Sequence, residues 1–276
     1  MNKLLFMGRK SYGAEALQWC IENGWDVVAV VTDDHQDTSP TANTARKYGL
    51  NLLDYEAFDK QIDSNSLEFD LAVSYVYWKI LKKPLIQIPK LGILNFHPAP
   101  LPELRGAGGF NLAILENHET FGVTVHYMDE GIDTGPIVEV DRFSIDAKSE
   151  TAQSLEKKSH KRMVELFKKT LTRVKKEGIL PSKKMSGGRH LSRKEMEERT
   201  CKASPLPSAP SPLANGASAF ASLPSSTALP PPLCARRRCE RSRWCDSRSY
   251  CCASRSTARV AAATYGRRAR ARTSGE

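Results

Sequence analysis

Short apolar runs alternate with helix-like patterns along roughly the first 200 residues, and this alternation restricts the fold more than any other feature. The runs at 3–7 and 26–31 are nearly all apolar, which is typical of parallel strands covered on both faces. Between them, residues 12–23 place a stripe of apolar side chains, Cys20 among them, on one helix face. A strand, a helix and a second strand in this order predict an α/β domain with a parallel sheet.

The remaining elements continue the same alternation. We expect further helices at 40–48, near 57, from Phe110 and at 151–176, and further strands near 52, at 71–74 and at 93–97. Residues 121–128 and 137–145 alternate like two paired strands, joined by a loop that contains Asp133. The sheet is therefore expected to be mostly parallel.

One strand ends in polar residues. The run at 91–97 is apolar until Asn95 and His97, and it would deliver both to the carboxyl edge of the sheet, where open α/β sheets bind ligands. Because side chains alternate along a strand, Asn95 and His97 share one face while Phe96 points to the other. Prolines at 98, 100 and 102 then stiffen the chain as it leaves the strand.

Asn95, His97 and Asp133 together offer an amide, an imidazole and a carboxylate for one reacting carbonyl. Each has an ordinary alternative reading when taken alone. The histidine could be a hydrogen-bonded structural residue, and the asparagine and aspartate could serve turns. Their combination favours an enzyme.

The segment from Asn95 to Asp133 resembles the catalytic segment of the folate-dependent formyltransferases, which carry Asn-x-His and, some tens of residues later, an Asp in a Gly-x-Asp-Thr-Gly loop. The sequence from Asn95 to Pro102, together with Arg105 and Gly106, most resembles the corresponding segment of the sugar N-formyltransferases. These enzymes act on amino groups of nucleotide-linked sugars. The resemblance implies a Rossmann-like formyltransferase domain over 1–195, with 10-formyltetrahydrofolate as the formyl donor.

Formyl transfer to a primary amine passes through a tetrahedral oxyanion, and the incoming ammonium must lose a proton. Asn95 can donate to the oxyanion, a contact worth about 3 kcal/mol when one such donor is removed. His97 can act as general base or, once protonated, as a donor. Asp133 can orient the imidazole and favour its charged form. The order of proton transfer stays open.

By the same resemblance, two segments are expected to wall the pocket for the folate. Aromatic and aliphatic side chains beside free backbone groups suit a flat, hydrogen-bonding heterocycle, although Trp78 and Ile80 could equally belong to the core. The candidate cofactor-binding residues are Tyr77, Trp78, Ile80, Leu81, Met128, Asp129, Glu130, Gly131 and Ile132.

The substrate-binding candidates are basic or hydroxyl side chains. Arg9, Lys10 and Ser11 come where the first strand feeds the first helix, a place that suits anions such as a phosphate. This segment lacks G-x-G-x-x-G, so a dinucleotide cofactor is a poor interpretation. Arg105 could pair a diphosphate bidentately or could be a solvent-facing charge, and Lys79 is a further candidate.

Composition changes abruptly near residue 200. Residues 201–276 hold 13 Lys and Arg against 3 Asp and Glu, so the net charge of +10 resides there. We expect a disordered Ala/Ser/Pro/Arg/Cys-rich tail over 196–276, of the kind that a frame error or read-through would produce. Its cysteines lack paired Cys-x-x-Cys spacing, so no metal site is expected. A basic tail that binds RNA is the alternative.

The amine substrate stays open at this stage. A nucleotide-linked amino sugar is favoured, methionyl-tRNA and glycinamide ribonucleotide are alternatives, and an inactive folate-binding protein is the alternative from another class. With no signal peptide and no apolar run of about 18 residues, we expect a cytoplasmic protein with a small-molecule partner and no membrane segment. Nucleic acid is not the expected partner, and a homodimer remains an option.

Overall fold

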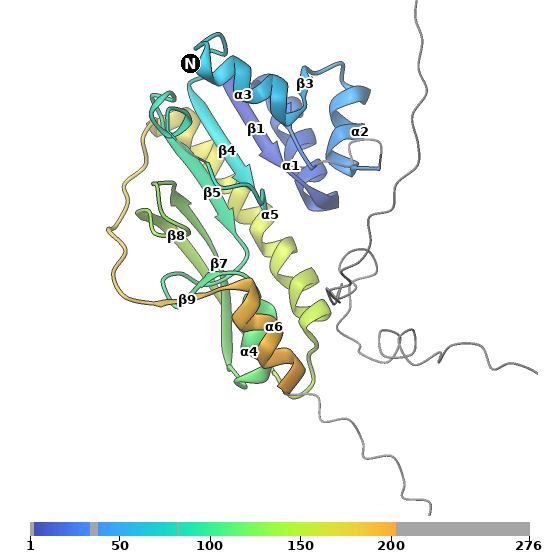
Figure 1. Cartoon of the computed structure of the whole chain (residues 1–276), viewed down its shortest axis with the longest axis vertical. Coiled ribbons are helices and arrows are strands. Elements are labelled where there is room, and N and C mark those ends of the chain that lie inside the picture. The colour runs from blue at the N-terminus through green and yellow to red at the C-terminus, as the bar shows by residue number, and fades with distance from the viewer. Residues whose placement is uncertain (1–2, 34–37, 82, 203–276) are drawn as a thin grey trace, which may run out of the picture. The chain divides into compact units, whose positions relative to one another are not determined.

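The computed structural model describes residues 3–33, 38–81 and 83–202, with side chains described as far as Arg199 (Figure 1). A seven-stranded sheet runs in the order β3-β2-β1-β4-β5-β7-β8, and a second sheet pairs β6 with β9. The strands are β1 (Lys3–Gly8), β2 (Asp26–Val31), β3 (Leu52–Leu53), β4 (Leu71–Tyr75), β5 (Ile93–His97), β6 (Leu104–Gly106), β7 (Thr120–Tyr127), β8 (Ile137–Ser144) and β9 (Arg189–Leu191).

The helices complete the domain. They are α1 (Lys10–Glu22), α2 (Pro40–Lys47), α3 (Tyr55–Asp63), the 3-10 turn η1 (Leu85–Gln87), α4 (Gly109–Leu115), α5 (Ala152–Glu177) and α6 (Arg193–Lys202). Several helices have a capping side chain at their first turn. Ser39 accepts a hydrogen bond from the amide of Ala42 at α2, and Asp54 accepts one from the amide of Ala57 at α3. Thr151 and Ser154 form a reciprocal cap at the start of α5.

The five strands from β3 to β5 are parallel, and β7 and β8 extend the sheet in antiparallel fashion. Helices cover both faces, which explains why the first strands are apolar on both sides. Leu4 and Phe6 pack into the cluster that includes α1 and α5, whereas Leu5 and Met7 pack into the cluster that includes α3. The predicted α/β class with a mostly parallel sheet is confirmed, and Cys20 is fully buried as expected.

Four elements had no counterpart in the sequence analysis: η1, the short strands β6 and β9, and α6. The segment from β9 to α6 returns to α4, far earlier in the chain (Figure 1). Because α6 continues to Lys202, it crosses the predicted domain boundary at residue 195, and the composition break near residue 200 lies closer to its end. The predicted division into a domain and a tail stays a prediction, since residues 203–276 lie outside the described part of the chain.

Candidate active site

Asn95, His97 and Asp133 meet at the carboxyl end of β5. Asn95 donates from Nδ2 to Oδ1 of Asp133 across 3.3 Å, and Nδ1 of His97 lies 3.5 Å from Oδ2 of the same carboxylate. Asn95 and His97 are 9% and 8% exposed, so the cluster lies largely out of water. The strand end and the β7–β8 loop thus bring together the three side chains that the sequence singled out.

The tautomer of His97 follows from its contacts. Its Nε2 lies 3.0 Å from the backbone oxygen of Leu104, and a carbonyl can only accept, so Nε2 carries the hydrogen. Nδ1 is then the nitrogen that faces Asp133. A second proton on this ring would be received directly beside the carboxylate.

His126 completes the cluster, although no sequence pattern had singled it out. Its Nδ1 donates to the backbone oxygen of Tyr127 across 2.8 Å, which leaves Nε2 to accept from Nδ2 of Asn95 across 3.0 Å. The feature that brings His126 to the site is strand register, because β5 pairs with β7 so that Asn95 lies opposite His126. Strand pairing between segments some thirty residues apart is not encoded locally, so alternation alone could not have identified it.

The amide of Asn95 is therefore fixed in direction, because its two hydrogens go to His126 and Asp133. An oxyanion formed at this site would have to receive one of these hydrogens. The bond to Asp133 is the longer of the two, so it is the one more easily exchanged.

Asp133 is held as a carboxylate. Burial by itself raises the pKa of this group, but the neighbouring His97 and the hydrogen bond from the amide of Gly106 outweigh burial and hold the pKa well below its usual range. The Gly106 amide donates to Oδ2 across 2.9 Å. Asp133 also has a positive φ of 50°, a left-handed conformation that aspartate tolerates better than most residues. The loop thus accepts local strain that places a charged acceptor beside His97.

The proline-rich exit from β5 is anchored by Thr124, a buried residue of β7. Its hydroxyl donates to the backbone oxygen of Ala99 across 2.8 Å and accepts from the amide of Leu101 across 3.0 Å. Thr124 lies opposite His97 in the β5–β7 register. One hydroxyl therefore ties the exit loop to the strand beside the imidazole.

The first predicted cofactor wall divides into buried and exposed parts. Leu81 is buried and Tyr77 half-buried, whereas Trp78 and Ile80 are 49% and 64% exposed, so the reading of these two as core residues is wrong. The Trp78 ring meets Tyr55 edge-on at 6.1 Å. Exposed apolar side chains grouped in this way often mark a binding surface.

The second predicted wall follows β7. Asp129 accepts from the amide of Gly131 and from the hydroxyl of Thr134, and these bonds close the turn that carries Asp133. Met128 packs on the core, and Ile132 is 45% exposed. Glu130 pairs with Lys83 across 2.6 Å, so an ion pair links this wall to the chain that follows the first wall.

The predicted substrate-binding side chains mostly contact the protein itself. Lys10 pairs with Glu156 across 2.7 Å, the Lys79 ammonium lies 3.0 Å from the centre of the Tyr55 ring, and Arg105 donates to the backbone oxygen of Gly188 across 3.3 Å. Arg9 occupies the N-cap position of α1, where its half-buried side chain makes no capping hydrogen bond, and Ser11 is exposed. Their predicted roles stay predictions.

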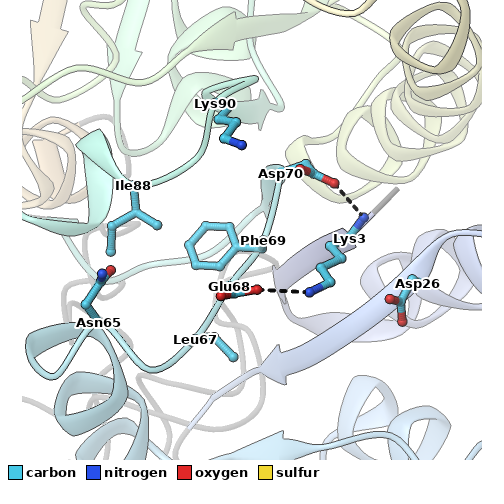
Figure 2. A pocket seen from close by; sticks show the side chains of 9 residues that line it. All are labelled: Lys3, Asp26, Asn65, Leu67, Glu68, Phe69, Asp70, Ile88 and Lys90. Atoms are coloured by element: carbon cyan, nitrogen blue, oxygen red, sulfur yellow. Dashed lines mark hydrogen bonds and ion pairs between the residues drawn. The ribbon is translucent and has the colours of Figure 1, made fainter. Parts of the chain in front are cut away.

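A hollow of about 650 Å³ lies at the opposite edge of the sheet, where the parallel strands begin (Figure 2). Lys3, which starts β1, pairs there with Glu68 across 3.1 Å and donates its amide to Asp70.

In the described ranges no group of three or more His, Cys, Asp or Glu could hold a metal ion. None of the described helices is long and apolar enough to cross a membrane.

The chain matches a known protein family. Residues 2–171 match the model of the formyl transferase family, described as "Formyl transferase". The match covers more than half of the chain, which therefore belongs to that family.

Among curated relatives, methionyl-tRNA formyltransferase of Bacillus licheniformis is 30% identical over 194 residues, covering 66% of this chain and 61% of the relative. The Bacillus cytotoxicus protein of the same name is 31% identical over 173 residues, covering 58% of this chain and 54% of the relative. The chain thus spans between half and two thirds of the length of these relatives.

Two solved structures share the fold. The N-formyltransferase from Helicobacter canadensis, in complex with folinic acid and dTDP-3-aminofucose, has a TM-score of 0.61 and 24% identity, covering 71% of this chain and 72% of that chain. Phosphoribosylglycinamide formyltransferase from Bacillus halodurans has a TM-score of 0.55 and 23% identity, covering 63% of this chain and 96% of that chain.

Proposed function

We propose that this protein transfers a formyl group from 10-formyltetrahydrofolate to a primary amine, with Asn95, His97 and Asp133 as its catalytic residues. The observation that carries the proposal is their convergence, largely out of water, at the carboxyl end of β5 in a chain of the formyl transferase family. Membership alone would not assign roles to residues, and the contacts among these three support the roles proposed for them.

Each residue acts through an atom whose state the contacts define. Asn95 would turn an Nδ2 hydrogen toward the developing oxyanion, while His126 keeps the amide in the correct orientation. Asp133, held ionised, would stabilise His97 when that ring carries a second proton. Both ring nitrogens of His97 face protein groups, so the substrate would replace one of these contacts, as catalytic hydrogen bonds often tighten only with substrate bound.

The formyl donor would supply the activated one-carbon group. The residues fit a folate in one specific respect: Trp78, Ile80 and Ile132 expose apolar surface from the two predicted walls, which suits a flat heterocycle. We assign the folate pocket to these walls.

For the amine, we propose a nucleotide-linked amino sugar. Arg9 and Lys10 at the start of α1, and Arg105 near the end of β6, offer cations for a diphosphate, although Lys10 would have to exchange its contact with Glu156. The shared fold with the Helicobacter canadensis protein, crystallised with dTDP-3-aminofucose, supports this choice. The curated relatives favour methionyl-tRNA as the second candidate.

The test is tetrahydrofolate release by the full chain from 10-formyltetrahydrofolate, with amino nucleotide-sugars, methionyl-tRNA and glycinamide ribonucleotide offered separately. We expect turnover with an amino nucleotide-sugar and a loss of about a hundredfold or more in His97→Ala. Glu165→Gln, which removes an exposed charge on α5 outside the site, is the control. Turnover with methionyl-tRNA alone would replace the substrate assignment, and undiminished turnover in His97→Ala would overturn the mechanism.

A further inference from the structure

The loop at 104–108 holds both His97 and Asp133 through its backbone. The carbonyl of Leu104 accepts from Nε2 of His97 across 3.0 Å, and the amide of Gly106 donates to Oδ2 of Asp133 across 2.9 Å. Any displacement of this loop therefore changes the distance and direction between imidazole and carboxylate.

The loop is fixed in turn by a segment more than 80 residues later in the chain. β6 pairs in parallel with β9. The amide of Ala107 donates to the backbone oxygen of Leu191 across 3.0 Å, and the amide of Arg189 donates to the backbone oxygen of Glu103 across 3.2 Å. Leu191 is 3% exposed, so the pairing includes a buried apolar anchor. We call residues 188–199 the clamp.

The fit between loop and clamp is tight at two glycines. A Cβ on Gly106 would lie 2.4 Å from the backbone oxygen of Leu191, and a Cβ on Gly188 would lie 1.7 Å from that of Pro102. Both glycines also have a positive φ. No other residue could occupy either position without moving the backbone.

An ion-pair network fastens the clamp to α4. Arg189 contacts Glu116 at 2.8 Å and Glu195 at 3.5 Å, and Arg199 contacts the same two carboxylates at 3.0 and 3.4 Å. Burial opposes ionisation of Glu116, but hydrogen bonds from Arg189 and His118 outweigh it and keep the pKa of this group below its usual range. An exposed pair alone contributes little, whereas two arginines that share two acids form a network.

We propose that the clamp positions His97 and Asp133 for catalysis, and that Arg189 is its principal positioning residue. The clamp acts through the loop whose carbonyl and amide contact His97 and Asp133. This inference rests on the proposed catalytic roles of His97 and Asp133.

The test uses the full chain labelled with ¹⁵N. Two-bond ¹H–¹⁵N correlations report which nitrogen of His97 carries the hydrogen, and a His97→Gln spectrum identifies the signal. We expect one tautomer, protonated at Nε2, in the parent protein and a mixture in Arg189→Met, with Arg189→Lys close to the parent. Arg173→Met is the matched control, because Arg173 also bridges two acids, Glu177 and Glu139, but on α5.

A second variant tests the clamp by steric crowding instead of by loss of charge. Gly188→Ala pushes on Pro102 and should disturb the tautomer like Arg189→Met does. In both variants kcat should fall by about tenfold or more while the folate dissociation constant stays within twofold, since small misplacements of catalytic groups are costly. An unchanged His97 tautomer in both variants overturns the clamp. If the parent shows the single tautomer but no turnover with any amine, the proposed function fails while the tautomer comparison still decides the clamp.

Discussion

The two edges of the sheet carry similar side chains in opposite environments. At the carboxyl edge, Asp133 is surrounded by His97, His126 and a backbone amide, and its pKa is strongly lowered. At the amino edge, Lys3 and Glu68 form an equally direct contact, but their side chains are 47% and 83% exposed (Figure 2). Water screens the second pair, so charge alone does not make a site; burial with a full set of partners does.

The largest effect should come from the carboxyl edge. Asn95→Ala removes the oxyanion donor, and turnover should fall by about a hundredfold or more while folate binding persists. Steady-state kinetics beside folate titration separate the two quantities. If turnover and folate binding fall equally, Asn95 is a binding residue. The difference between the two edges would then not lie in catalysis by Asn95.

A smaller loss is expected one contact further out. His126→Phe keeps a ring in the buried position but removes the acceptor that orients the Asn95 amide, so kcat should fall about tenfold, equivalent to about 1.4 kcal/mol. His126→Gln, which can still accept a hydrogen bond, should retain more activity. Equal kcat in both variants and the parent would show that the amide needs no orientation by this ring.

The pH dependence of stability should also separate the edges. Because the folded pKa of Asp133 is depressed, its ionised form stabilises the fold above the unfolded value of about 4, and this contribution is lost as pH falls through the folded pKa. The stability difference between the parent and Asp133→Asn should therefore be full at pH 7 and shrink below about pH 4. Urea unfolding at a series of pH values measures it, and a difference independent of pH would contradict the assigned charge.

Glu156 extends this test away from the catalytic cluster. Its contact with His160 and its ion pair with Lys10, set against the opposing effect of burial, lower its pKa to about 2. Glu156→Gln should cost about 1–2 kcal/mol of unfolding free energy at pH 7, after allowance for screening. The loss should disappear as pH falls from about 4 toward 2. A cost that persists at the lower pH would point to packing and not charge.

The smallest effect is expected at the amino edge. Glu68→Gln breaks the exposed pair with Lys3, so the unfolding free energy should stay within about 0.5 kcal/mol of the parent. Turnover should not change. A loss comparable with that of His126→Phe would show that the hollow near Lys3 is coupled to the site.

Local patterns predicted most of this fold because they depend on residues close together in the chain. The strands β1, β2, β4 and β5 and the helices α1, α2 and α5 follow from apolar spacing, and the shared face of Asn95 and His97 follows from strand alternation. These inferences needed no knowledge of distant contacts.

What could not be predicted depends on such contacts. β6 and β9 have three residues each, and they form only because residues 189–191 return to residues 104–106. His126 joins the site through strand register, and the engagement of Lys10 by Glu156 spans 146 residues. Neither apolar period nor turn chemistry contains this information.

The proposed role of His97 in formyl transfer can be tested by following the formyl carbon itself. The full chain would be given 10-[¹³C]formyltetrahydrofolate and an amino nucleotide-sugar, and ¹³C NMR would record where the label goes. We expect an N-formyl signal on the amine in the parent protein, and none above background in His97→Ala. Label released only as formate, or transferred equally by both proteins, would contradict that role.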